Sequence, residues 1–201
     1  MTALTAEQQR MVLDGAVQLF AKTDLDSITL DKLARACGIS AFDIVRHYQC
    51  RENILDAVLE RELELMAAAA HAPQLRMPGE TLRDELHVLA GVILQEYRRR
   101  LPFLGRLLAQ SLQDPGVGAR FYRCFIVQGR RLFTEFLAER QSLGELRDDL
   151  DPEAAATVFL AAVTGPILLN ELFGGRDVET LDDERLLASI SEIFLRGVRS
   201  A

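Results

Sequence analysis

Residues Thr29 to Ile54, TLDKLARACGISAFDIVRHYQCRENI, predict two short helices joined by a tight turn, followed by the start of a third helix. The apolar residues of the first short helix fall on one face at helical spacing: Leu33, Ala34 and Cys37. Gly38 can end that helix in the left-handed region without strain, and Ser40 can cap the helix that follows. This pattern is typical of a helix-turn-helix, whose second helix enters the major groove of DNA.

The rest of the chain continues in helical periodicity, and no segment shows the alternation of a convincing strand. We therefore expect an all-α fold of about nine helices. Residues 6–50 would form a three-helix head that contains the helix-turn-helix, and residues 51–201 a helical body, with the helix over 51–70 linking the two. Pro102 is expected to end the helix that begins near Thr81, because proline inside a helix removes a hydrogen bond.

Charge limits how such a head can bind nucleic acid. The 201-residue chain carries a net charge of −7. Residues 1–62, which contain the head and the first part of the linking helix, hold 7 Lys and Arg against 10 Asp and Glu, a net charge of −3. This balance argues against a general nucleic-acid binder. For the head to bind DNA, a second copy of the protein on the same DNA site, or a salt-sensitive interaction, would be required.

Composition also limits which kind of protein this chain can be. An odd count of three cysteines at unrelated spacings suggests a reducing cytoplasm rather than a disulfide framework. Cys37, His47 and Cys50 lack a fourth ligand for zinc, so neither a metal nor another cofactor is expected. The uncharged run Ala154–Asn170 falls short of a membrane span and is interpreted as a buried helix. No nucleophile–base pair or phosphate loop is evident, so we expect no enzyme activity.

The order of these elements resembles the TetR (tetracycline-repressor-like) family of bacterial transcriptional regulators. The resemblance spans the whole architecture, but its specific motifs lie in residues 10–60. The matching positions in the head are Ala16, Leu19-Phe20, Thr29, Leu33-Ala34, Gly38-Ile39-Ser40, Tyr48 and Arg51-Glu52. The Asp151-Pro152-Glu153 helix start, Thr164-Gly165 and the ending Phe194-Leu195-Arg196-Gly197 also look like the family.

The resemblance implies a ligand-responsive DNA-binding regulator in the cytoplasm, with double-stranded operator DNA as its partner. We expect a repressor that binds a pseudo-palindromic operator as a homodimer and is released by a small, largely apolar effector. The residues expected at the DNA are Thr29, Lys32, Ser40, Ala41, Phe42, Asp43, Arg46, His47 and Arg51. Phe42 could touch a thymine methyl group or pack within the head.

Three departures from the family pattern concern DNA binding. Val45 replaces a Tyr that contacts phosphate in most relatives, and Asp43 replaces a small hydroxyl residue. An Asp there repels phosphate unless it reads a cytosine amino group. Arg51 replaces the usual Lys and keeps its charge.

The body is expected to hold the effector and the second subunit. Pocket residues implied by the resemblance are Met66, Leu89, Ile93, Phe103, Phe121 and Phe125, although each could equally be core. The wide apolar stripes of the last two helices predict a dimer interface at Val158, Ala162, Gly165, Leu169, Leu187, Ile190 and Phe194.

Two alternatives stay open at this point. One is a related helical dimer whose DNA recognition is weakened or altered, as Asp43 and Val45 suggest. The other is a small helical enzyme that uses the body pocket.

Overall fold

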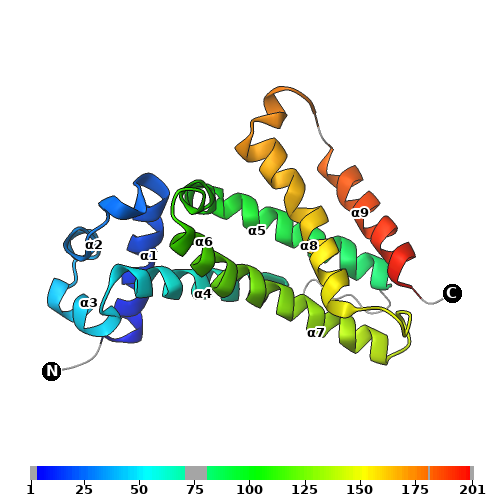
Figure 1. Cartoon of the computed structure of the whole chain (residues 1–201), viewed down its shortest axis with the longest axis horizontal. Helices are drawn as coiled ribbons and strands as arrows, with labels where there is room; N and C mark the ends of the chain where they lie inside the picture. The colour runs from blue at the N-terminus through cyan, green and yellow to red at the C-terminus, as the bar shows by residue number, and fades with distance from the viewer. Residues whose placement is uncertain (1–3, 71–80, 181, 200–201) are drawn as a thin grey trace. The chain divides into compact units, whose positions relative to one another are not determined.

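The predicted all-α fold is confirmed. The computed structural model describes residues 4–70, 81–180 and 182–199, and within these ranges helices are joined by turns without an extended strand (Figure 1). The helices are α1 (Ala6–Lys22), α2 (Leu30–Cys37), α3 (Ala41–Tyr48), α4 (Arg51–Ala70), α5 (Leu82–Ser111), α6 (Pro115–Phe121), α7 (Gln128–Ser142), α8 (Pro152–Ile167) and α9 (Asp183–Val198).

The chain forms two compact units. Unit 1 contains residues Met1–Glu64 and Arg100–Ile126, and unit 2 contains Leu65–Arg99 and Val127–Ala201. The helices α4 and α5 therefore each contribute to both units. Compact units need not coincide with functional domains. The division into a DNA-binding head over 6–50 and a body over 51–201 therefore stays a prediction.

The helix-turn-helix lies in unit 1 and follows the local signals of the sequence. Gly38 adopts φ 68° at the end of α2, and the side chain of Ile39 is buried beside it. The Thr29 hydroxyl caps α2 by accepting a hydrogen bond from the Lys32 N–H at 3.2 Å. The expected side-chain cap by Ser40 is wrong: the Ser40 hydroxyl makes no such bond, and its carbonyl accepts from the Ile44 N–H instead.

Pro102 does not end its helix, contrary to expectation. Helix α5 continues through Pro102 to Ser111. A proline inside a helix costs about 3 kcal/mol. The turn that follows buries three large side chains, each only 2% exposed: Phe103, Leu104 and Leu107. Burial of about 1.5–3 kcal/mol for each such side chain offsets the cost of the proline.

The helical periodicity of residues 117–141 predicts one long helix, but the segment is divided. Asp114 caps α6 by accepting from the Gly116 N–H at 2.8 Å, and Pro115 occupies the first turn. Asp114-Pro115-Gly116 has the composition of a turn, yet here Asp-Pro starts a helix, as it does at Asp151-Pro152 of α8. A π-helical stretch, Tyr122–Val127, then connects α6 to α7.

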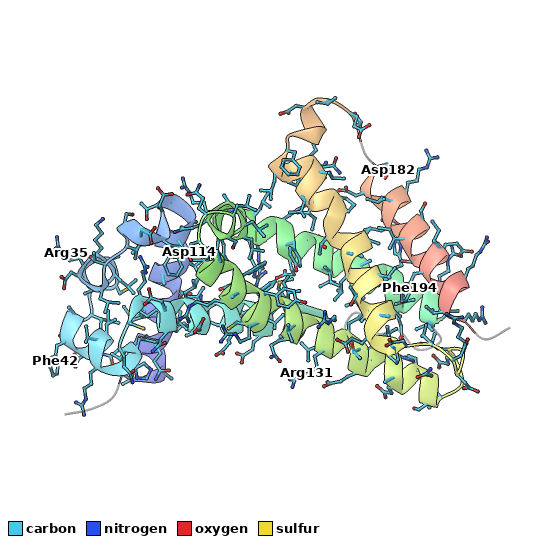
Figure 2. The ribbon with its side chains drawn as sticks, viewed as in Figure 1. Arg35, Phe42, Asp114, Arg131, Asp182 and Phe194 are labelled. Carbon is cyan, nitrogen blue, oxygen red and sulfur yellow. The ribbon has the colours of Figure 1, made fainter. Side chains whose placement is uncertain are left out.

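Unit 2 has an aromatic core between α7, α8 and α9. The ring centroids of Phe133 and Phe159 lie 4.8 Å apart, as do those of Phe159 and Phe194. Figure 2 shows Phe194 on α9, on the side that faces α8. These rings fix the two last helices of the chain against α7.

Within unit 2, a cluster of ion pairs holds the segment that connects α8 to α9 against α5. Arg98 on α5 donates to both carboxylate oxygens of Asp183, at 2.9 Å for its Nη2, and its Nε donates to Glu171 at 2.8 Å. Arg176 contacts the same two carboxylates. Hydrogen bonds from Arg98 lower the pKa of Asp183 below its ordinary value.

This cluster predicts an acid-sensitive contribution to stability. A lowered folded-state pKa stabilises the protein above the unfolded pKa, about 3.9 for Asp, and that contribution is lost as pH falls through the folded value. We expect Asp183→Asn to cost about 1 kcal/mol at pH 7, and the difference from wild type to shrink steadily as pH falls below about 4. Urea unfolding across this range measures it. Asp149→Asn, at an exposed carboxylate, is the control, and a difference that persisted undiminished at low pH would contradict the assignment.

Candidate DNA-binding site

Helix α3 has one buried face and one open face. Ile44 and Tyr48 point into unit 1, with 0% and 7% exposure. Phe42 is 62% exposed and Val45 44% exposed. Figure 2 shows Phe42 projecting outward from α3, so its alternative role in the core of the head is excluded.

The basic residues expected at DNA surround this open face. The side chains of Arg46 and His47 are exposed near the end of α3, and the His47 ring lies edge-on to Tyr48, with centroids 4.6 Å apart. Lys32 is exposed on α2, as is a further basic residue of that helix, Arg35. The Lys32 ammonium donates to the Ser27 carbonyl at 2.6 Å, which leaves two of its three donors for another partner.

The remaining predicted residues lie near the N-terminus of α3 and at the start of α2. Thr29 and Ser40 are exposed, and Ala41 and Asp43 are half-buried. Since the Ser40 hydroxyl makes no capping bond, it can still hydrogen-bond to a phosphate.

Arg51 is turned towards the protein. Its Nη1 donates to the Leu25 carbonyl at 2.7 Å and lies 3.3 Å from an Asp26 carboxylate oxygen. Its Nη2 donates to Glu52 at 3.1 Å. In this arrangement Arg51 holds the loop before α2, and a phosphate would compete with these partners.

The short 3-10 helix Leu25–Ser27 is a junction that the sequence did not reveal. The side chain of Gln110, near the end of α5, accepts from the Leu25 N–H at 3.0 Å. Arg106, one turn earlier, donates to the Ala21 carbonyl at 3.1 Å. Because these partners are more than 80 residues apart in sequence, no local pattern could have predicted them.

A strained turn separates α3 from α4. Gln49 adopts φ 66° and ψ −51°, and the Cys50 N–H donates to the Tyr48 carbonyl at 2.8 Å. This is a γ-turn of the rare, strained kind. The Asn53 amide donates to the same carbonyl at 2.8 Å, and thereby helps to fix the angle between α3 and the start of α4.

The six residues expected at an effector pocket are divided between the units. Met66, Leu89 and Ile93 belong to unit 2, and Phe103, Phe121 and Phe125 to unit 1. A cleft of about 1050 Å³ within unit 2 has different walls, at the start of α5 and the ends of α7 and α9. Its charged residues are Arg83, Asp84, Arg140, Glu145, Glu192, Arg196 and Arg199. This polar lining differs from the apolar pocket that the sequence suggested.

The predicted dimer residues fall into two groups. On α8 and the π turn after it, Val158 and Leu169 are 62% and 61% exposed, and Ala162 and Gly165 are half-buried. On α9, Leu187 and Phe194 lie in the core of unit 2, whereas Ile190 is half-buried. The open apolar position of α9 is Ile193, 72% exposed, although helical periodicity predicts an inward position for it.

The expectation of a buried helix over Ala154–Asn170 is therefore only partly correct, because much of its apolar surface is open. Among the described residues, Pro152–Leu172 is the one helical segment that is long and apolar enough to cross a membrane by length and composition alone. A core helix of a soluble protein can pass the same test. In the described parts of the chain, no group of three or more His, Cys, Asp or Glu is placed to hold a metal ion.

A helix-turn-helix beside a larger set of helices places the chain among DNA-binding regulators, and comparison with known proteins identifies the family. Residues 98–197 match the family described as AefR-like transcriptional repressor, C-terminal domain. The HTH-type transcriptional regulator AcrR of Shigella flexneri is 27% identical over 94% of this chain and 90% of its own. UidR of Escherichia coli K12, also an HTH-type transcriptional regulator, is 20% identical over 94% of this chain and 88% of its own.

Solved structures share the fold. The flavonoid-responsive regulator FrrA superposes with a TM-score of 0.75 at 22% identity, over 97% of this chain and 98% of its own. GusR of Salmonella enterica gives a TM-score of 0.73 at 19% identity, over 96% of this chain and 98% of its own. The chain belongs to the TetR family of transcriptional regulators. Because members of this family are transcriptional regulators, the alternative of a small helical enzyme that uses the body pocket is excluded.

Proposed function

We propose that this cytoplasmic regulator is a repressor that binds a pseudo-palindromic operator as a homodimer and leaves it when a small, largely apolar effector binds. The strongest support for this proposal is the open face of α3, which presents exposed apolar and basic side chains to solvent next to the helix-turn-helix turn. The residues proposed at the DNA are those expected from the sequence, except that Arg51 acts by positioning the loop at Leu25.

A dimer is supported by an exposed apolar stripe that begins on α8. Its members recur alternately three and four residues apart, the spacing of a helix–helix seam: Val158, Ala161, Gly165, Leu168 and Leu172. A side chain built at Gly165 would meet nothing within 4 Å, so a partner helix has room to approach there. Ile193 of α9 adds to the open apolar surface of unit 2. Contact with a second copy would remove this surface from water.

Release by an effector would follow from population shift. An effector that prefers a conformation with misplaced heads lowers DNA affinity by the ratio of its affinities for the two conformations. FrrA, one of the structural neighbours, is by name flavonoid-responsive. That name supports a small organic molecule as the kind of effector.

The proposal is tested by selecting sequences from a random duplex pool with the full-length protein and measuring their affinity by fluorescence anisotropy at several salt concentrations. We expect a palindromic consensus and strong salt dependence. Arg46→Ala, on the exposed end of α3, should weaken binding and reduce the slope of log affinity against log salt by about 2, one phosphate contact per head.

Arg131→Ala is the matched control, because Arg131 is an exposed arginine on α7 in unit 2 (Figure 2). It should leave affinity and slope unchanged. Failure to enrich any sequence at low salt would reject DNA recognition and favour the alternative in which this dimer has lost it. An enriched sequence without two-fold symmetry would reject the dimeric operator.

A further inference from the structure

The open face of α3 has an unusual chemistry for a surface that meets DNA. Two of its exposed large side chains are apolar, Phe42 and Val45. They are three residues apart on a helix and therefore lie next to each other. Ala41, four residues before Val45, extends the same face. Apolar side chains cannot neutralise a phosphate, so phosphate contacts in this region fall to the basic residues beside them, such as Arg46, four residues after Phe42.

The fold does not explain why these residues are apolar. Ile44 and Tyr48 already supply the contacts of α3 with the rest of unit 1. Phe42 leaves 62% of its surface in water, so it forgoes most of the stabilisation of about 1.5–3 kcal/mol that burial of a Phe side chain gives. A polar residue at this position would serve the head equally well.

Base-pair edges in the major groove offer one apolar group, the 5-methyl of thymine. The basic residues flanking the face, Arg46 and His47, can hold it against the DNA backbone. We infer that Phe42 and Val45 recognise thymine methyl groups, so that operator specificity rests on apolar contacts at defined thymines. This inference rests on the proposed function, and names the bases that the same site reads.

Asp43 strengthens the assignment. Its half-buried carboxylate lies between the two apolar residues in sequence and repels phosphate, which favours base edges over the backbone at this part of α3. Asp43 thereby adds an acceptor for a cytosine amino group beside this face.

Uracil substitution provides a direct test, because an A·U pair keeps every hydrogen-bonding group of A·T and removes only the methyl. Each thymine of the selected duplex is replaced in turn, and the affinity of the full-length protein is measured by anisotropy. We expect one or two sensitive thymines in each half-site. The loss should be about fourfold for each methyl and about sixteenfold for a symmetric pair, from the transfer free energy of one methyl group.

Protein variants make the test specific. Phe42→Ala and Val45→Ala should bind the thymine duplex more weakly and become insensitive to uracil at the thymine that each contacts. Both side chains are exposed, so thermal unfolding should be unchanged. Leu112→Ala, an exposed apolar residue beyond the end of α5 with 90% exposure, should behave as wild type.

The outcomes separate the two proposals. A selected sequence whose affinity is unaffected by uracil at every thymine would overturn methyl recognition and leave the regulator intact. Unchanged affinity in both Phe42→Ala and Val45→Ala would also overturn it, and would point to this face as a surface for another protein. Failure to select any sequence rejects the proposed function and this inference together.

Discussion

Arg100→Ala should lower the free energy of unfolding by about 3–5 kcal/mol, the cost of leaving one charge of a buried ion pair without its partner. The Arg100 Nε donates to Glu62 at 2.8 Å, and the two side chains are only 5% and 8% exposed. Without Arg100, the Glu62 carboxylate would keep its bond from Arg61 and lose the one from α5. Urea unfolding at pH 7 measures the change.

Two comparisons make this prediction specific. Arg99→Ala removes the neighbouring arginine, which is 66% exposed and paired with Glu96, and should cost less than about 1 kcal/mol. Glu62→Met combined with Arg100→Met replaces the buried pair by apolar side chains and should recover most of the loss. Equal effects of Arg99→Ala and Arg100→Ala would show that burial of the pair has no energetic weight.

Val158→Glu is expected to dissociate the proposed dimer and to weaken operator binding by about 100-fold or more. A carboxylate at this position would have to be desolvated in the seam between two subunits. A monomer retains a single head and loses the gain in affinity that two linked binding events provide. Sedimentation equilibrium reports the association state, and anisotropy on the selected duplex reports the affinity.

Leu143→Glu is the control for this experiment. Leu143 is 64% exposed at the end of α7 in unit 2, close in exposure to Val158 at 62%, and outside the apolar stripe. It should change neither the association state nor the affinity. A Val158→Glu protein that remained dimeric at micromolar concentration would place the subunit contact elsewhere.

Local chemistry explains what could be predicted from the sequence. Gly38 ends α2 and Thr29 caps it because both effects depend on residues within one turn. The helix starting at Asp151 followed from Asp-Pro in the same way. The helix end predicted at Pro102 was wrong, because burial of the residues after Pro102 outweighs the local cost of the proline. Only the tertiary structure shows this burial.

The site was harder to predict where neighbouring positions on a helix differ in exposure. Ile193 and Phe194 are adjacent and both apolar, so hydrophobicity alone could not tell that Phe194 joins the rings of Phe133 and Phe159 and Ile193 stays open. Arg51 was expected at phosphate because of its charge. Its partner, the Leu25 carbonyl, lies 26 residues earlier and becomes visible only in the fold.

The peptide groups of Leu25 tie the DNA-reading helices to two other parts of unit 1 at once. Gln110 of α5 accepts from the N–H, and Arg51 of α4 donates to the carbonyl. Any sliding of the last turn of α5 against the first turn of α4 must therefore break one of these bonds or drag the loop before α2 with it. The loop before α2 therefore couples the position of the helix-turn-helix to that of both α4 and α5.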